Sequence, residues 1–273
     1  MMKRLRRAHD YFRSNGIRST ANKIAKNTWQ YAVNTPQRLK YRDFVRQLPF
    51  RDAGEIFSEI YERNLWESKE SRSGIGSELV ATKNVRDHLP IIFEKFEIVN
   101  IFDAPCGDFN WMRLVPLHPN MAYIGWDIVP AIIEANKAKS EDAQHRFAVG
   151  NILLDPLPSA DIMICRDCLF HFSNADILLA LENFLKSKIK FFLSTSHTAL
   201  DESTNTDIPT GYFRRIDLFS EPFCFPRNVL YSVDDFAPNH VGRQMHMWNR
   251  VQVARAVIGL RKFCNQPVQY EPA

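Results

Sequence analysis

The sequence predicts an α/β fold in which helices cover both faces of a mostly parallel, seven-stranded sheet. Between residues 98 and 196, five short apolar segments alternate with helical segments, a pattern typical of parallel strands joined by right-handed crossovers. Two further segments, 229–233 and 246–253, have the composition of strands and would add an antiparallel pair. Acidic residues end the first two strands, at Asp103 and Asp127, which is typical of a ligand site at one edge of such a sheet.

The composition is that of a globular intracellular protein. The chain has 273 residues, of which 45% are hydrophobic and 24% are charged, enough for one domain of about 200 residues with an appendage. Its five cysteines form no disulfide-like framework, so a reducing compartment is expected. No apolar run approaches the roughly 20 residues of a membrane span, and the basic start lacks the apolar stretch of a secretion signal. We therefore expect a cytoplasmic protein.

Residues 1–51 form a basic arm ahead of a domain at 52–273. The arm holds thirteen Lys or Arg and two acidic residues, a net charge of +11, which leaves −7 for the remainder. Apolar residues recur at helical spacing along it: Ala21, Ile24, Ala25, Trp29, Ala32 and Val33. The predicted helix could rest on an anionic membrane surface at the inner membrane face, or on a polyanion. It could equally pack on its own domain or on a second subunit.

The segments before the sheet are expected to be helical. Residues 53–64 favour a helix, and residues 65–76 form a polar loop with two glycines. Residues 78–89 favour a second helix. We expect this helix to end at Pro90, because proline lacks the N–H that a helix interior needs.

The first strand, 98–103, leads into the tight turn Pro105-Cys-Gly107. The strand carries Val and Ile residues that suit burial on both faces of a sheet. After the turn, Asp108 or Asn110 is expected to cap a helix that carries Trp111 and Met112. A strand, a sharp turn and a helix N-terminus together build a ligand crevice in open α/β sheets.

The later elements continue the alternation. Strands are expected at 121–127, 145–151, 160–166 and 190–196, with a helix from Pro130 and another at 174–186. Proline suits the first position of a helix. A long irregular stretch, 197–226, separates these elements from the last two strands.

The acids at the strand ends indicate which ligand the crevice binds. Asp127, at the end of the second strand, suits the two hydroxyls of a ribose, as in dinucleotide-binding folds. Asp103 and Asp108 flank the turn where a dinucleotide would place its pyrophosphate, and two carboxylates would repel it. They suit a cationic amino group instead. S-adenosylmethionine (SAM), which has a ribose, an ammonium and a sulfonium but no phosphate, is therefore favoured over NAD.

Asp103-Ala-Pro-Cys-Gly-Asp-Phe109 resembles the first motif of class I SAM-dependent methyltransferases, an acid followed by G-x-G-x-G. Two of the three glycines are replaced, by Pro105 and Phe109. Together with 66–77, 125–130 and 165–171, the motif resembles a bacterial branch in which the Pro-Cys-Gly-Asp-Phe form is usual. The resemblance covers residues 57–250 and implies a Rossmann-like fold and the cofactor SAM. The relatives look like modifiers of surface polysaccharides, which implies a glycan acceptor.

Nine residues are expected to contact the cofactor. Asp127 would bind the ribose, or else cap the following helix, and Asp103 would hold the ammonium directly or through water, or else cap its turn. Gly107 lets the backbone approach the ligand. By resemblance, Asn151 and Ile152 would contact the adenine, and Ser77 the methionine carboxylate, if its segment is not an ordinary loop. The full set is Ser77, Asp103, Pro105, Gly107, Asp127, Ile128, Asn151, Ile152 and Arg166.

Three residues are candidates for catalysis. Methyl transfer depends mainly on alignment in a dry site, and a base is needed only when the acceptor hydroxyl must lose its proton. His171 is a candidate because imidazole has a suitable pKa, or it only supports its loop. Asp167 and His197 are the other candidates. Cys165 and Cys168 form a C-x-x-C without a second ligand pair, so no metal is expected.

The long stretch 197–226 is expected to contact the acceptor, since long loops after sheet strands usually carry specificity. Arg214 and Arg215 could bind an acidic acceptor or pair with carboxylates of their own domain. Tyr212 could stack on a sugar or another ring, or cover the sheet.

The sequence therefore predicts a SAM-dependent methyltransferase that modifies an oxygen of a glycan or small molecule. RNA methylation through the basic arm is an alternative, but Arg166-Asp-Cys-Leu stands where an Asn/Asp-Pro-Pro-aromatic motif would follow the fourth strand, so nucleic acid is disfavoured. A binding protein that has the fold but no activity is the second alternative.

Overall fold

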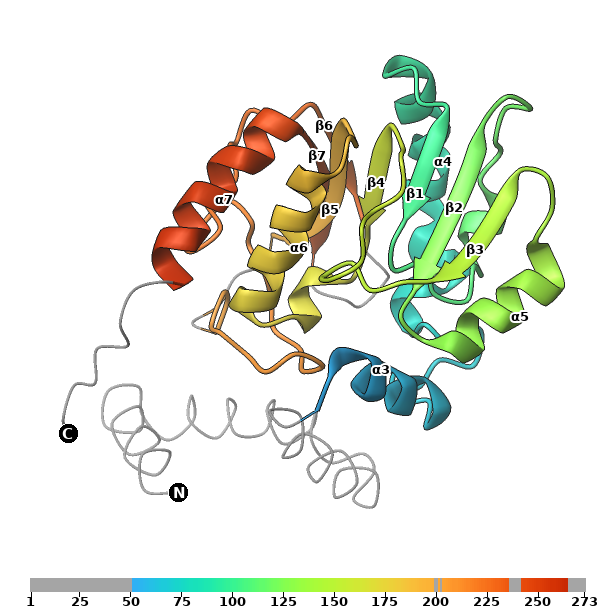
Figure 1. Cartoon of the computed structure of the whole chain (residues 1–273), viewed down its shortest axis with the longest axis horizontal. Coiled ribbons are helices and arrows are strands. Elements are labelled where there is room, and N and C mark those ends of the chain that lie inside the picture. The colour runs from blue at the N-terminus through green and yellow to red at the C-terminus, as the bar shows by residue number, and fades with distance from the viewer. Residues whose placement is uncertain (1–50, 199–200, 202, 236–241, 265–273) are drawn as a thin grey trace, which may run out of the picture. The chain divides into compact units, whose positions relative to one another are not determined.

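The computed structural model describes residues 51–198, 201, 203–235 and 242–264 (Figure 1). The basic arm predicted at residues 1–51 lies outside this range except for Arg51. Its predicted helix and its contacts with a membrane or a second subunit therefore stay predictions.

Seven strands form one sheet in the order β3-β2-β1-β4-β5-β7-β6. The strands are β1 (Asn100–Asp103), β2 (Ala122–Asp127), β3 (His145–Val149), β4 (Ile162–Cys165), β5 (Phe191–His197), β6 (Tyr231–Asp234) and β7 (Arg243–Asn249). Strands β1 to β5 pair in parallel, whereas β7 is antiparallel to both β5 and β6. The mostly parallel, seven-stranded sheet predicted from the sequence is confirmed.

Helices cover both faces of this sheet. They are α3 (Ala53–Glu62), α4 (Leu79–Lys95), α5 (Pro130–Ser140), α6 (Asn174–Lys186) and α7 (Arg250–Cys264). Helices α6 and α7 lie side by side over one face (Figure 1), and α4 packs on the other face together with part of α5. Helix α3 lies below the sheet in the view of Figure 1.

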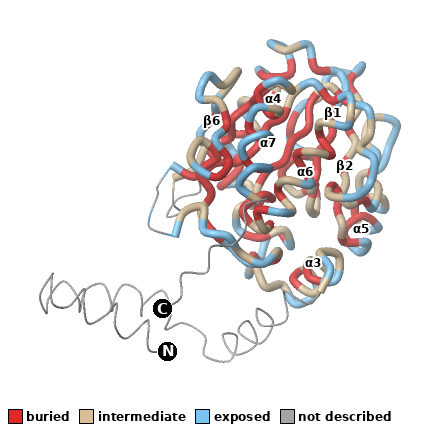
Figure 2. Tube along the Cα trace, turned by 60° about the vertical axis from the view of Figure 1, so that its left-hand side comes forward, coloured by how far each residue is buried: buried red, intermediate tan, exposed pale blue. Residues whose placement is uncertain are grey.

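Successive strand residues face the two layers in turn. In β1, Ile101 packs in the core with α4, and its neighbour Phe102 packs in the core with α6 and α7. Figure 2 shows the strands as buried segments at the centre, with the exposed positions on the outer sides of the helices. A strand buried on both faces reads as a continuous apolar run, which is why this strand could be identified from its sequence.

The sequence predicted that helix α4 ends at Pro90. The helix instead continues to Lys95. Proline in a helix interior loses one backbone hydrogen bond and usually kinks or breaks the helix. Beyond it, however, Ile92 and Phe93 are buried in the core on this face of the sheet. Burial of these two large apolar side chains is worth about 1.5–3 kcal/mol each. This gain offsets the cost of Pro90 in the helix interior, and the helix continues past the proline.

The prediction of a helix after Asp108 is also wrong. Only the single 3-10 turn η3 (Met112–Leu114) follows this residue. The Asp108 side chain does not cap a helix; it accepts hydrogen bonds from Ser71 and from the backbone of Arg72, both 36 or more residues earlier in the chain. Trp111 and Met112 are buried. Contacts that are distant in sequence therefore override the local capping pattern here.

The last strand ends at Asn249, and helix α7 replaces the continuation expected to residue 253. The Asn249 side chain accepts a hydrogen bond from the Gln252 backbone, and the Gln252 side chain accepts one from the Asn249 backbone. This reciprocal capping box starts a helix. Its buried residues recur at helical spacing, at Val253, Ala256, Val257 and Leu260, so the sequence did contain the signal.

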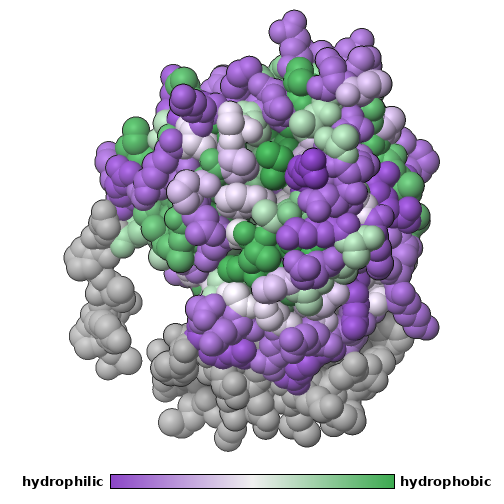
Figure 3. All heavy atoms as spheres, turned by 45° about the vertical axis from the view of Figure 1, so that its right-hand side comes forward, coloured by the Kyte–Doolittle hydropathy of each residue, from purple (hydrophilic) through white to green (hydrophobic). Residues whose placement is uncertain are grey.

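None of the helices formed by the described residues combines the length and apolar character that crossing a membrane requires. On the face shown in Figure 3, hydrophobic residues occur in small groups between hydrophilic ones. Such scattered surface apolar residues are normal for globular domains.

Candidate active site

A cavity lies where β1, β2 and β4 end. Its floor is formed by the residues that end or follow these strands: Pro105 to Gly107, Asp127 to Val129, and Arg166 to Cys168. Helix α3 and the segment up to Ser77 supply the opposite wall. The empty volume, including the solvent at the open mouth, is about 940 Å³.

Asp127 lies at the end of β2 and lines this cavity. One carboxylate oxygen accepts the Gly107 N–H at 3.1 Å and the other accepts the Val129 N–H at 3.0 Å. Burial raises the pKa of Asp127 to about 6, although these backbone hydrogen bonds favour the charged form. Each carboxylate oxygen can accept further hydrogen bonds, so the side chain suits a ligand with two adjacent hydroxyls.

The turn after β1 contains a glycine in a left-handed conformation. Gly107 has φ +55°, a backbone conformation that favours glycine. A Cβ at this position would meet the Ser73 hydroxyl at 2.3 Å. Pro105 and Gly107 both line the cavity, as predicted for the cofactor site.

Asp108 fastens the segment 71–77 over this turn. Its carboxylate accepts the Ser71 hydroxyl at 2.9 Å and the Arg72 N–H at 2.8 Å, and its own N–H donates to the Ser73 hydroxyl at 2.8 Å. The predicted cofactor residue Ser77, which lies farther along this segment, lines the cavity. The carboxylate of Asp108 thus organises the wall.

The residues predicted for the adenine lie at a third part of the cavity. Ile128, Asn151 and Ile152 line it together. The Asn151 side-chain oxygen accepts the Leu153 N–H at 2.9 Å, while its backbone N–H donates to Asp155. These bonds fix the loop after β3 and leave the side-chain amide N–H groups of Asn151 as available donors.

Asp103 is not among the residues that line the cavity. It is buried, and its carboxylate accepts the Tyr123 hydroxyl at 2.7 Å. Burial raises its pKa to about 7, and the Tyr123 hydrogen bond and the charge of Arg166 oppose this rise. The direct ammonium contact predicted for Asp103 is therefore not supported by its position.

Arg166 lines the cavity, but most of its donors are used within the protein. Its Nε and Nη2 donate to Asp235 at 3.0 and 2.7 Å, and Nη2 also donates to the Gly76 carbonyl at 2.8 Å. The guanidinium lies 5.4 Å from the ring centre of Trp111. Arg166 thereby ties the end of β4 to residue 235, which directly follows β6, and to the segment that covers the cofactor turn.

Asp167 lines the cavity next to this cluster and is a poor candidate for a base. Its Oδ2 lies 3.1 Å from Arg243 and 3.4 Å from Arg166. Burial disfavours the charged carboxylate, but the two arginines outweigh burial and hold the pKa of Asp167 below its usual value. A carboxylate of lowered pKa does not readily keep a proton that it has taken.

His171, from the turn η4 (Leu169–His171), has the geometry of a base. Its Nδ1 lies 2.8 Å from the Tyr212 carbonyl oxygen, which can only accept, so Nδ1 carries the proton and Nε2 keeps its lone pair. Burial lowers the pKa of His171, so the ring is neutral near pH 7. The side chain lines the cavity.

His197 does not have this geometry. Its Nδ1 accepts the Ile216 N–H at 3.2 Å, and its ring packs against Phe170 with the centres 5.3 Å apart. Burial lowers its pKa to about 4. It is not among the residues that line the cavity, and its position therefore does not support the catalytic role predicted for it.

The residues predicted to bind an acceptor from the stretch 197–226 do not line the cavity. Arg214 is buried and donates to three oxygens of its own domain. Arg215 pairs with Asp201. The Tyr212 side chain is exposed, and it is the backbone carbonyl of Tyr212 that reaches His171. Both arginines therefore pair with groups of their own domain, which was the alternative to acceptor binding.

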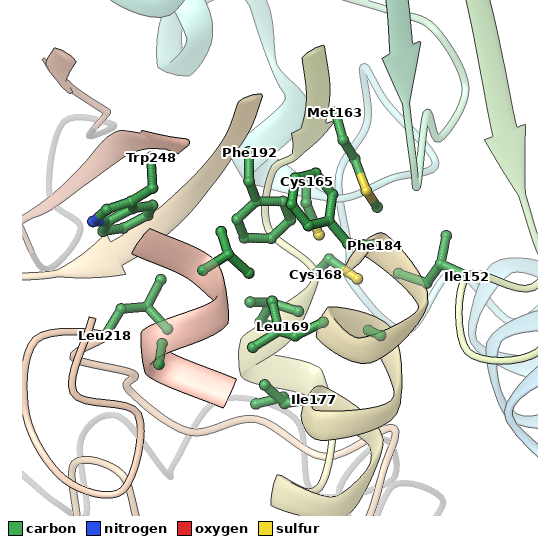
Figure 4. Close-up of a cluster of buried hydrophobic side chains, with 14 of the residues drawn as sticks. Ile152, Met163, Cys165, Cys168, Leu169, Ile177, Phe184, Phe192, Leu218 and Trp248 are labelled. Carbon is green, nitrogen blue, oxygen red and sulfur yellow. The ribbon is translucent and has the colours of Figure 1, made fainter. Parts of the chain in front are cut away.

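Cys165 and Cys168 lie together inside the hydrophobic core on the α6 side (Figure 4). Its hydrogen bond to Cys165 and burial raise the pKa of the Cys168 thiol, which makes this thiol unreactive. Among the described residues, no group of three or more His, Cys, Asp or Glu is placed to hold a metal ion.

The sequence did not indicate the aromatic wall of the cavity. Phe57 and Tyr61 of α3 line it, as do Trp66 and Phe172. The ring centres of Phe57 and Trp66 lie 6.5 and 5.6 Å from that of His171. Helical spacing places residues 57 and 61 on one face of α3, but nothing in the local sequence shows that this face meets residue 171.

Comparison with known families agrees with this architecture. Residues 106–190 match the model of an O-methyltransferase domain, a segment that extends from the cofactor turn to the start of β5. No protein in a collection of curated sequences matches the chain.

Many solved structures share the fold. PigF with SAH has a TM-score of 0.52 at 11% identity and covers 78% of this chain and 68% of its own. Magnesium protoporphyrin IX methyltransferase from Synechocystis PCC 6803 with bound SAM has a TM-score of 0.50 at 10% identity, covering 73% and 98%. Human N-acetylserotonin methyltransferase with SAM has a TM-score of 0.48 at 17% identity, covering 77% and 65%. The chain thus spans less than two thirds of this last protein. The predicted Rossmann-like fold is confirmed. The match to an O-methyltransferase domain agrees with the predicted enzyme class, and the three solved structures named here contain SAM or SAH.

Proposed function

We propose that this chain, which has the fold of SAM-dependent methyltransferases, transfers the methyl group of SAM to a hydroxyl oxygen of a small-molecule acceptor. The observation that carries the proposal is the shared cavity of Asp127 and His171. Asp127 suits a ribose at the end of β2, and His171 offers an unprotonated Nε2 in the same cavity.

The residues that line the cavity provide a donor and acceptor set suited to SAM. Asp127 would accept the ribose hydroxyls, and Asn151 with Ile152 would contact the adenine beside them. The glycine at 107 lets Ser73 pack closely on the turn after β1, where a Cβ would meet the Ser73 hydroxyl at 2.3 Å. The methionine end would lie toward Ser77 and Arg166, where a cation suits its carboxylate.

When bound, SAM supplies a methyl carbon that is electrophilic because it is attached to a sulfonium. Cleavage of its carbon–sulfur bond would neutralise the sulfonium and balance the new bond from the methyl carbon to the acceptor oxygen. His171 Nε2 takes the hydroxyl proton, and the Tyr212 carbonyl stabilises the resulting imidazolium through Nδ1–H. The proton then passes to solvent.

The wall around His171 favours an acceptor with a flat apolar face. The rings of Phe57, Trp66 and Phe213 have their centres within 6.5 Å of the His171 ring, and such rings stack on planar groups. A flat aromatic alcohol meets these features best. The glycan predicted from the resemblance would have to stack through the apolar face of a sugar.

The proposal can be tested with the full chain and methyl-labelled SAM. The label is offered together with a panel of phenols and hydroxylated heterocycles, and in parallel with sugar lipids, nucleotide sugars and RNA. We expect label on an oxygen of a phenol or heterocycle, and we expect His171→Gln to abolish it. If the label appeared only on sugars or RNA, the acceptor would be a sugar or RNA and not an aromatic alcohol. SAM binding without any transfer would instead support a binding protein.

A further inference from the structure

We propose that Arg214 is a positioning residue for the reaction: its buried guanidinium fixes the turn that carries His171 and thereby aims Nε2 into the cavity. This inference rests on the proposed function, because it assigns His171 as the base. It replaces the role in acceptor binding that the sequence predicted for Arg214.

The guanidinium of Arg214 holds the residues directly after His171. Its Nη2 donates to the Phe172 carbonyl at 2.9 Å, and its Nη1 donates to the side-chain oxygen of Asn174 at 2.8 Å. Nη1 also donates to the Thr206 carbonyl at 3.1 Å. One side chain therefore joins the His171 turn, the start of α6 and the loop at 206.

The backbone around Arg214 holds His171 from the other side. The Arg214 N–H donates to the Phe170 carbonyl at 3.2 Å, and the Gly211 N–H donates to the His171 carbonyl at 2.7 Å. The Tyr212 carbonyl lies between these two contacts and accepts from His171 Nδ1. Segment 211–214 and turn 170–172 thus form a ladder of contacts, and the Arg214 side chain closes its end.

Burial of an arginine to stabilise a turn costs free energy, because the charged guanidinium is removed from water. Arg214 is 4% exposed, its Nε has no hydrogen-bond partner among the described residues, and its nearest carboxylate, Asp207, lies 3.5 Å away on the surface. Burial lowers the pKa of Arg214 to about 10. An apolar side chain would often be as stable at such a site, which points to a requirement for the guanidinium's three directed hydrogen bonds.

Arg250 offers a matched comparison at the other end of α6. Its guanidinium donates to the carbonyls of Phe184, Leu185 and Ile189 at 2.7 to 3.2 Å. It lies 5.7 Å from the ring centre of Phe184, much as Arg214 lies 5.5 Å from that of Phe223. Both arginines tie backbone carbonyls together beside an aromatic ring, but none of the groups that Arg250 contacts lines the cavity.

The test compares Arg214→Lys with Arg250→Lys in the full chain. Lysine keeps the charge but cannot donate in the planar geometry of the guanidinium. We expect both substitutions to lower Tm to a similar extent. Only Arg214→Lys should lower kcat, by about 10- to 100-fold because a small misplacement of a catalytic group is costly, while the KM for SAM stays within twofold.

Nitrogen NMR of the His171 ring, without any cofactor, gives a second readout. We expect wild type and Arg250→Lys to show the Nδ1–H tautomer and a pKa below the ordinary value. In Arg214→Lys, the Nε2–H tautomer should appear and the pKa should move back toward about 6.5.

Arg214→Lys with an unchanged tautomer and unchanged kcat would overturn the proposal, and so would an equal loss of kcat in Arg250→Lys. Failure of the proposed function is distinguishable, since it appears as no SAM binding and no transfer in the wild type. The NMR measurement of the His171 tautomer requires neither SAM binding nor methyl transfer. If Arg214→Lys does not fold, Arg214→Gln, which retains a planar donor, is compared in the same way with Arg250→Gln.

Discussion

The two ends of the cavity are built in different ways. At the cofactor end, Asp127 is the last residue of β2 and Gly107 lies on the turn after β1, and backbone N–H groups hold the carboxylate of Asp127 in place. At the acceptor end, His171 meets Phe57 and Trp66, which lie more than 100 residues earlier in the chain, and Tyr212, which lies 41 residues later. The groups at the strand ends of the first end are polar, whereas the second end is aromatic and is assembled from segments that are distant in sequence.

This difference predicts which substitutions should affect SAM binding and which should affect turnover. Substitutions at the cofactor end are expected to alter SAM affinity, because the groups there are the ones proposed to bind the ribose and the adenine. Substitutions at the acceptor end are expected to alter turnover or the KM for the acceptor and to leave SAM affinity unchanged. A substitution that altered both equally would break the distinction.

The largest effect is expected at the acceptor end, from His171→Gln. Loss of a positioned base typically costs about 10²- to 10⁴-fold in rate, and glutamine keeps a polar side chain of similar size. We expect kcat to fall by such a factor while the dissociation constant of SAM stays within twofold. Turnover would be followed with labelled SAM and affinity by calorimetry. Unchanged turnover would remove His171 as the base.

At the cofactor end, Asp127→Asn should weaken SAM binding by roughly 1–3 kcal/mol, as expected when buried polar partners are left unmet. The asparagine cannot accept from both ribose hydroxyls and from the two backbone N–H groups that Asp127 holds. Calorimetry measures the affinity, and the Tm shows whether the fold persists. A variant that stays folded and binds SAM as well as wild type would contradict the ribose role.

The pH dependence should also divide between the two ends. Because burial raises the pKa of Asp127 to about 6, the carboxyl becomes protonated as the pH falls through 6 and loses acceptor capacity. SAM binding therefore requires the loss of a proton in this range, and its affinity should fall by up to about tenfold for each pH unit below 6. Asp127→Asn should show weak binding without this dependence. A wild-type affinity that is constant from pH 7 to 5 would sink the idea.

Trp66→Ala should raise the KM for an aromatic acceptor by about 2- to 10-fold, the equivalent of the 0.5–1.5 kcal/mol of one aromatic contact. The side chain lines the cavity and lies 5.6 Å from the His171 ring. SAM affinity should not change, because the groups expected at the ribose and the adenine are untouched. Steady-state kinetics at saturating SAM measures the effect. A loss of SAM affinity without a change in acceptor KM would move Trp66 to the cofactor end.

The smallest effect is expected from Arg215→Ala. The side chain pairs with Asp201 at the surface and is absent from the cavity wall, and exposed pairs contribute only about 0–1 kcal/mol. Kinetic constants should stay within about twofold of wild type, and Tm should fall by a few degrees at most. A large rise in acceptor KM would restore the acceptor-binding role that the sequence predicted for this arginine.

The same division explains what could be predicted from the sequence. The strands and the positions of Asp127 and Gly107 follow from apolar runs that end in polar turns, a pattern carried by consecutive residues, whereas Asn151 was proposed by resemblance. The capping box of Asn249 and Gln252 was equally local but was overlooked. By contrast, whether Pro90 ends its helix depends on the apolar residues buried beyond it, on a core that no short window displays.

The roles of the polar residues were harder to predict for the same reason. Asp103 carries the right charge in the right strand, but its carboxylate faces Tyr123 on the neighbouring strand instead of the cavity. Arg214 has the chemistry of an anion-binding residue, and only the fold shows that its donors are used by Phe172, Asn174 and Thr206.

The most direct measurement is calorimetric titration of the full-length protein with SAM, for wild type and Asp127→Asn in parallel. We expect one molecule of SAM per chain for wild type and an affinity at least about fivefold lower for the variant, the lower limit implied by an unmet buried polar group. Absence of binding to wild type, or equal binding to both, would contradict the placement of the cofactor at the end of β2.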